Sequence, residues 1–103
     1  MKPKVLVFGE DDTLLAVRSA VLRSRGLLVA GTTSLDHVMS VAEQFDAVVV
    51  CTSASFVSRE QLQHLARETP QTSVVFLNQT DMNDPEKWQR QVEVAAHKTS
   101  STS

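Results

Sequence analysis

Short apolar segments alternate with longer amphipathic segments along this 103-residue chain. The apolar segments are rich in Val and Phe, and each is four or five residues long. They occupy residues 4–8, 27–30, 47–50 and 73–77. Continuous apolar runs of this length are typical of strands that are buried on both faces, as in a parallel sheet. The sequence therefore predicts four buried strands.

The segment after the first strand has apolar residues at helical spacing. Leu14, Val17, Val21 and Leu22 are predicted to line one face of this helix. Gly26 follows where a helix C-cap is expected. This segment therefore predicts a helix that links the first two strands.

Two further helices are predicted between the later strands. Ser34 is an expected N-cap, and an apolar helix face follows it through Val38 to Phe45. Ser58 begins a capping-box pattern that precedes Leu62 at the start of the third helix.

The segment after the fourth strand has two interpretations. Asp84 followed by Pro85 is typical of a helix start. Trp88, Val92 and Ala95 are then spaced for one apolar face of a helix ending near His97. Alternatively, residues 92–96 form a fifth strand that ends near Lys98. We favour the helix, because the strand would leave the helix before it very short.

The order of elements indicates an α/β fold. Strands that alternate with helices of about ten residues form βαβ units, which gives a doubly wound parallel sheet with helices on both faces. The 42% of hydrophobic residues fit one globular domain. We expect this domain to span residues 1–98 and a polar tail to occupy residues 99–103.

Composition excludes several classes of protein. Ten Lys and Arg residues against twelve Asp and Glu give a net charge of −2, without the basic excess of a nucleic-acid module. No apolar run has the length of a membrane span or of a signal-peptide core, so we expect a cytoplasmic protein. Cys51 is the single cysteine, which excludes an internal disulfide and a site with several cysteine ligands.

Three consecutive carboxylates, Glu10, Asp11 and Asp12, follow the first strand. Open α/β sheets bind ligands at this end of their strands, and Mg²⁺ prefers carboxylate oxygens. Asp11 and Asp12 are therefore candidate Mg²⁺ ligands, with Glu10 as an accessory group. We favour the alternative, in which one of the two aspartates caps the following helix, because a metal site needs a further oxygen ligand. No cofactor is required by the sequence.

These segments resemble response-regulator receiver domains, the CheY-like family. The match covers about residues 2–78: the first strand with its acidic end, the third strand beginning after Asp46, and the fourth strand after Pro70. The resemblance implies a three-layer, flavodoxin-like fold. It also implies a place in a two-component phosphorelay, in which the acidic pair binds magnesium and an aspartate after the third strand is phosphorylated.

The chain departs from the family at the positions that the resemblance assigns to phosphorylation. Cys51 stands where the phosphoacceptor aspartate is expected, and Asn78 stands where a hydroxyl residue is expected. Lys98 matches the switch lysine only if the fifth strand exists. The last strand–helix unit of the family is therefore incomplete here, which leaves a sheet of four or five strands.

Cys51 is open to three interpretations: an inert buried residue, a thiol that is modified, or a catalytic nucleophile. A reactive thiolate needs nearby positive charge, whereas the neighbours expected here are carboxylates. A nucleophile needs a histidine base, but the three histidines, at positions 37, 64 and 97, lie on predicted helices. We favour the inert interpretation.

The sequence thus predicts an atypical receiver-like signalling domain that is not phosphorylated on aspartate and acts by contact with another signalling protein, a histidine kinase or an output protein. The alternative is a small redox- or ligand-responsive α/β module that uses Cys51. An enzyme is not expected, because neither a glycine fingerprint nor an acid–base constellation is present. We also expect a homodimer, because an incomplete last unit would leave an uncovered sheet face or an open strand edge.

Overall fold

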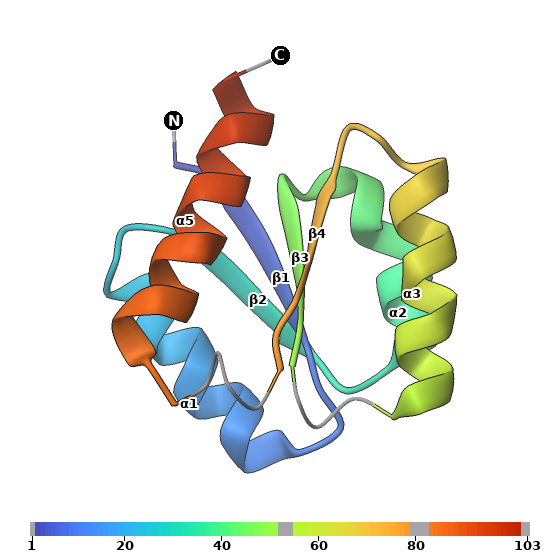
Figure 1. Cartoon of the computed structure of the whole chain (residues 1–103), viewed down its shortest axis with the longest axis horizontal. Helices are drawn as coiled ribbons and strands as arrows, with labels where there is room; N and C mark the ends of the chain where they lie inside the picture. The colour runs from blue at the N-terminus through green and yellow to red at the C-terminus, as the bar shows by residue number, and fades with distance from the viewer. Residues whose placement is uncertain (1, 52–54, 79–82, 102–103) are drawn as a thin grey trace.

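The computed structural model describes residues 2–51, 55–78 and 83–101, and it contains a parallel sheet of four strands in the order β2-β1-β3-β4 (Figure 1). Strands and helices alternate along the chain, as the sequence predicts. The elements are β1 (Lys4–Phe8), α1 (Asp12–Arg23), β2 (Leu28–Thr32), α2 (Leu35–Val41) with a 3₁₀ turn η1 (Ala42–Gln44), β3 (Ala47–Val50), α3 (Phe56–Glu68), β4 (Ser73–Phe76) and α5 (Pro85–Ser101).

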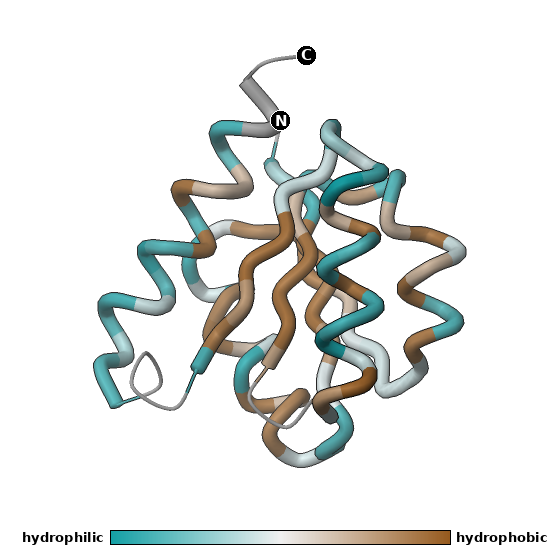
Figure 2. Tube along the Cα trace, turned by 45° about the vertical axis from the view of Figure 1, so that its right-hand side comes forward, coloured by the Kyte–Doolittle hydropathy of each residue, from teal (hydrophilic) through white to brown (hydrophobic). Residues whose placement is uncertain are grey.

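Helices cover both faces of the sheet, which gives three layers. Helices α1 and α5 lie on one face, and α2 and α3 lie on the other (Figure 1). The tube coloured by hydropathy shows mostly apolar strands between helices in which hydrophilic and hydrophobic residues alternate (Figure 2). The predicted fold class, a flavodoxin-like three-layer α/β sheet, is confirmed.

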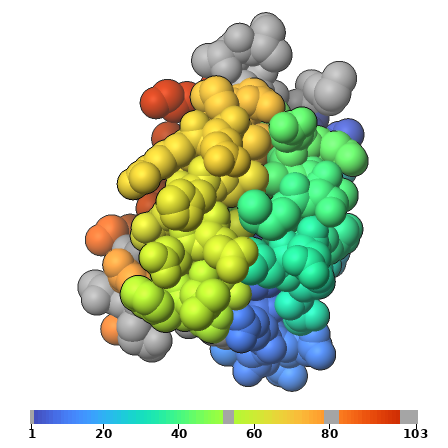
Figure 3. Space-filling model, turned by 90° about the vertical axis from the view of Figure 1, so that its right-hand side faces the viewer, coloured from blue at the N-terminus to red at the C-terminus, as the bar shows by residue number. Residues whose placement is uncertain are grey.

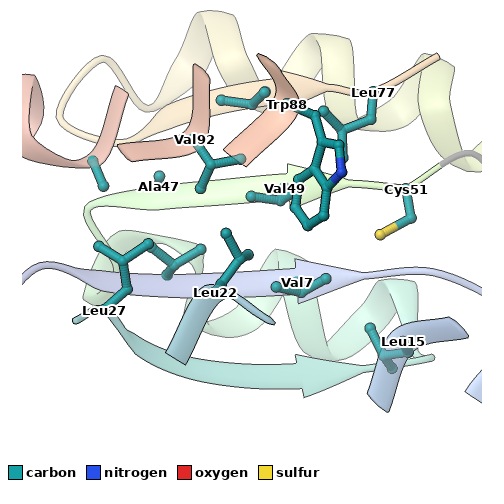
Figure 4. Packing of buried hydrophobic residues seen from close by; sticks show 13 residues of the cluster. Val7, Leu15, Leu22, Leu27, Ala47, Val49, Cys51, Leu77, Trp88 and Val92 are labelled. Carbon is teal, nitrogen blue, oxygen red and sulfur yellow. The ribbon is translucent and has the colours of Figure 1, made fainter. Parts of the chain in front are cut away.

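Alternation along the strands builds a separate core on each face of the sheet. Successive side chains of a strand point to opposite faces, so one apolar run supplies both cores. The core beneath α1 and α5 contains Val5, Val7, Leu15, Leu22, Leu27, Ala47, Val49, Cys51, Val75, Leu77, Trp88, Val92 and Ala96 (Figure 4). The core beneath α2 and α3 contains Leu6, Phe8, Val38, Ala42, Val48, Val50, Leu62 and Leu65.

Helix α5 settles the two interpretations of the last segment. Residues 92–96 are helical, and the described part of the chain contains no fifth strand. Trp88 and Val92 are buried against β3 and β4, as predicted. The third buried residue of this helix face is Ala96, whereas Ala95, which was predicted there, is only half-buried beside the core. The helix continues to Ser101, beyond the expected end near His97, because the segment has no Gly or Pro to stop it.

The position of α5 also corrects one argument for a homodimer. We expected part of the sheet face beside α1 to lack a cover. Instead, α5 packs on this face over β3 and β4, next to α1 (Figure 1). An uncovered sheet face therefore gives no reason for self-association, and only the open strand edges remain.

The face of α1 and the burial of β2 differ from the prediction. Leu15, Ser19 and Leu22 face the core, whereas Leu14 is 40% exposed and Val17 is 56% exposed. A Cβ on Gly31 of β2 would lie 3.2 Å from the Ser19 Oγ and 3.3 Å from the Leu15 Cγ, so the missing side chain lets this other face of α1 approach the sheet. Strand β2 begins and ends one to two residues later than predicted, and it is largely exposed because it is an edge strand.

Most of the predicted helix ends are present. The Ser34 Oγ accepts a hydrogen bond from the His37 N–H, and Asp84 caps α5 ahead of Pro85. Helix α3 begins earlier than predicted: its N-cap is Ser55, which accepts from the N–H of Ser58. Ser58 forms this bond as a residue of the first turn, so the predicted capping box is wrong.

None of the helices among the described residues has the length and hydropathy that crossing a membrane would require.

Candidate functional site

The carboxyl ends of β1, β3 and β4 lie together at one end of the sheet, where α/β sheets of this kind bind ligands. Glu10 and Asp11 follow β1, Cys51 follows β3, and Asn78 follows β4 shortly after its end. The first turn of α3 lies at the same end of the sheet, because Ser55 and Ser58 contact Glu10. Residues 52–54, between β3 and the start of α3, lie outside the described residues.

Glu10 connects the loop after β1 to the start of α3. Its Oε1 accepts from the Ser55 backbone N–H at 3.1 Å and from the Ser58 Oγ at 3.1 Å. These bonds favour the ionised carboxylate, and they lower the pKa of Glu10 below its usual value of 4.5, with the bond from the Ser55 backbone as the largest cause. Glu10 is therefore a structural acceptor that also benefits from the positive end of the α3 dipole.

Asp11 is the N-cap of α1. Its Oδ1 accepts from the Leu14 N–H at 3.0 Å, and its backbone is extended, as an N-cap requires. Asp12 is the first residue of the helix and is exposed. Over the described residues, no three His, Cys, Asp or Glu side chains converge in a way that could hold a metal ion. The candidate Mg²⁺ ligands thus lie at the carboxyl ends of the strands, as expected, and one of them, Asp11, is already used as the N-cap of α1.

Cys51 lies inside the core beneath α1 and α5 and has no exposed surface. Burial raises the pKa of its thiol, and the positive charges of Arg18 and Arg59 oppose this effect only in part. We expected carboxylate neighbours to disfavour the thiolate and so to raise this pKa. That reason is wrong, because the charged neighbours are two arginines and the dominant cause is desolvation.

Arg59 closes the end of the sheet between β3 and β4. Its Nη2 donates to the carbonyl of Cys51 at 2.9 Å and to the carbonyl of Leu77 at 2.6 Å. The two strands would need further backbone N–H groups to continue their ladder beyond this point. The guanidinium takes their place, and it puts a positive charge beside the position that the receiver resemblance assigns to the phosphoacceptor.

Arg18 approaches the same cysteine from α1. Its side chain is half-buried, and its Nη1 is inaccessible and has no hydrogen-bond partner among the described residues. The charge of this guanidinium thus acts on Cys51 inside the core, where screening by water is weak.

The remaining predicted positions lie apart from this arrangement. Asn78 is exposed just beyond β4. Lys98 lies in the last turn of helix α5, so the strand on which its switch role depends is absent from the described chain. Phe56, the first residue of α3, is 80% exposed. All three histidines are exposed, as predicted.

Three roles were not predicted from the sequence: the charge of Arg18 near Cys51, the bonds of Arg59 to the strand ends, and the cap formed by Ser55. Arg59 follows Cys51 by eight residues, and no local motif indicates that its side chain turns back to the strand end. The one available signal for Ser55 is the spacing Ser55-x-x-Ser58, in which the first hydroxyl caps the helix and the second reaches Glu10.

Comparison with known proteins gives no further guide to the site, since no family model matches the chain and no curated protein matches it.

The chemistry available at this end of the sheet is therefore limited. The buried thiol is held in its neutral form by desolvation, one carboxylate is bound to α3, and another is bound to α1. Two guanidinium groups stand where a phosphorylation site would collect carboxylates around a metal ion.

Proposed function

We propose that this protein is a receiver-like signalling module that is not switched by aspartyl phosphorylation and acts by contact with a separate signalling protein, a histidine kinase or an output protein. One observation carries the proposal. At the end of β3, where the receiver resemblance expects an exposed phosphoacceptor, the chain has a fully buried Cys51 whose carbonyl is bound by Arg59.

The acidic end of β1 supports the same conclusion. In the receiver pattern, the carboxylates after the first strand hold the magnesium ion that phosphoryl transfer needs. Here Glu10 is bound by two donors of α3, and Asp11 is bound by the start of α1. These bonds engage the Glu10 Oε1 and the Asp11 Oδ1, so each carboxylate already has a structural role at the start of a helix.

The hydrogen bonds of Glu10 also anchor the surface formed by the start of α3, at the same end of the sheet. Phe56 is 80% exposed and Val57 is 60% exposed, and both lie in the first turn of α3, which Glu10 anchors through Ser55 and Ser58. Exposed aromatic residues on a rigid element are typical anchors of protein interfaces. We place the contact with the separate partner at this turn of α3.

The test is incubation of the purified chain with acetyl phosphate and Mg²⁺, followed by intact mass spectrometry. A receiver domain that has the phosphoacceptor aspartate, treated in parallel, is the positive control. The proposal predicts an unchanged mass for this chain. A stable phosphorylated species would overturn it.

A redox-responsive module that uses Cys51 is the second candidate, and the positive charges of Arg18 and Arg59 favour its thiolate. Burial opposes both ionisation and access. Labelling with a thiol reagent at neutral pH distinguishes the two candidates. We expect slow labelling of the native protein and fast labelling after unfolding, and fast labelling of the native protein would favour the redox module instead.

A further inference from the structure

The sheet has two edges, and they differ in how they are protected. Strand β2 forms one edge and β4 forms the other. An edge strand exposes a row of backbone N–H and C=O groups that can pair with another strand, and natural proteins usually obstruct such a row with charge, proline or a covering element. The difference between the two edges therefore indicates which one is suited to pairing.

The β2 edge is obstructed by basic side chains. The Arg23 Nη2 donates to the carbonyl of Val29 at 3.2 Å, which occupies an outward acceptor of this strand. Lys4 and Arg23 also line a hollow beside β2, whose floor includes Leu28. A second copy that approached this edge would bring the same positive charges toward it.

Among the described residues, no side-chain hydrogen bond occupies an outward backbone group of β4, in contrast to the Arg23 bond on β2. The N–H groups of Ser73 and Leu77 donate to Asp46 and Val50, so these residues and Val75 between them face β3. By alternation, the backbone groups of Val74 and Phe76 point outward, away from β3, which is the one described strand that pairs with β4. Helices α3 and α5 lie on opposite faces of the sheet, and β4 runs along the edge between them (Figure 1).

The segment around β4 is also free of charge. Residues 69–80 contain no Asp, Glu, Lys or Arg, so the paired strands themselves would bring no like charges together. Val74 and Phe76 are half-buried beside the core beneath α2 and α3, which leaves part of each side chain for a partner. Figure 3 shows how completely α2 and α3 cover this face of the molecule, so that a partner strand is limited to its margin.

We propose that two copies of this chain pair through β4, antiparallel and about a two-fold axis at Val75, to form one continuous sheet. In this register, Val74 of each copy faces Phe76 of the other. Both outward N–H groups and both outward carbonyls of each copy then have partners. The pairing also puts an aromatic residue opposite a β-branched residue on each side of the axis, a favourable cross-strand combination. The inference does not depend on the proposed signalling role.

Sedimentation velocity over a concentration series tests the proposal with the full chain and two matched variants. Val74→Lys adds a charge at the β4 edge, and Leu28→Lys adds the same charge at the β2 edge, where Leu28 is 46% exposed. We expect a dimer for the wild-type chain and for Leu28→Lys. For Val74→Lys we expect a dissociation constant raised about tenfold or more.

Three results would overturn the proposal: a wild-type chain that is monomeric at every concentration, a dimer unaffected by Val74→Lys, or a dimer lost only in Leu28→Lys. Circular dichroism shows whether each variant folds. If Val74→Lys does not fold, hydrogen exchange of the wild-type amides decides. Protection of the Val74 and Phe76 amides that decreases on dilution supports β4 pairing, and unprotected amides in a dimeric sample contradict it.

Discussion

Replacing Trp88 by alanine tests whether α5 is an integral part of this fold. Trp88 lies in the first turns of α5 and is 4% exposed. Its ring packs in the core beneath α1 and α5, near Val49 and Leu77 (Figure 4). If α5 takes the place of a longer last strand–helix unit as the cover of β3 and β4, removing this ring must destabilise the whole domain.

The size of the effect follows from the burial of the ring. A buried aromatic side chain removes roughly 150–250 Å² from water, which at about 25 cal/mol per Å² corresponds to ~4–6 kcal/mol. Alanine retains the Cβ, and substitutions of this kind cost about 3–5 kcal/mol. The total stability of a small domain is about 5–15 kcal/mol. We therefore expect Trp88→Ala to remove at least about a fifth of the free energy of unfolding.

Urea unfolding followed by far-ultraviolet circular dichroism measures the loss, because the substitution removes the only tryptophan. Val94→Ala is the matched control: Val94 lies on the same helix and is 60% exposed, so its loss should change stability by no more than about 0.5 kcal/mol. The reasoning fails if Trp88→Ala costs less than about 1 kcal/mol, or if both variants lose the same amount.

Three further predictions concern the sheet end and the first helix. Arg59→Ala should lower the free energy of unfolding by about 1–2 kcal/mol, because two buried carbonyls lose a charged donor, and chemical denaturation measures it. Glu10 has a lowered pKa, so its bonds stabilise the fold above the usual carboxyl pKa and this contribution is lost as the pH falls through the lowered value. The difference in stability between the wild-type chain and Glu10→Gln should therefore decrease toward acid pH, and a constant difference would contradict the assignment. Gly26 has a φ of 85°, so Gly26→Ala should cost about 1–2 kcal/mol, and Gly26→Asn should lower the melting temperature less.

Much of the fold could be predicted because local pattern and burial agree. The apolar runs of β1 and β3 are buried on both faces, so their sequence carries a strong signal. Asp84 and Pro85 mark the start of α5 through rules that act within one helical turn. The face of α1 was not predictable in this way. It depends on the close approach of Ser19 to Gly31, two residues that are distant in the sequence.

The candidate site was likewise predictable only where local rules determine it. The location of the site at the carboxyl ends of the strands follows from strand order, and the cap at Asp11 follows from local capping rules. The surroundings of Cys51 do not, because Arg18 and Arg59 reach it from two different helices through long side chains. The charge around a strand end thus depends on tertiary contacts that no spacing in the sequence indicates.

The central claim is that this sheet end does not accept a phosphoryl group. The most direct measurement is a titration with beryllofluoride and Mg²⁺, which together mimic a phosphorylated aspartate, followed through the backbone amide NMR spectrum. The account predicts no change at the amides of Glu10, Asp11, Cys51 and Arg59. Saturable shifts that extend from these residues across the domain would contradict it.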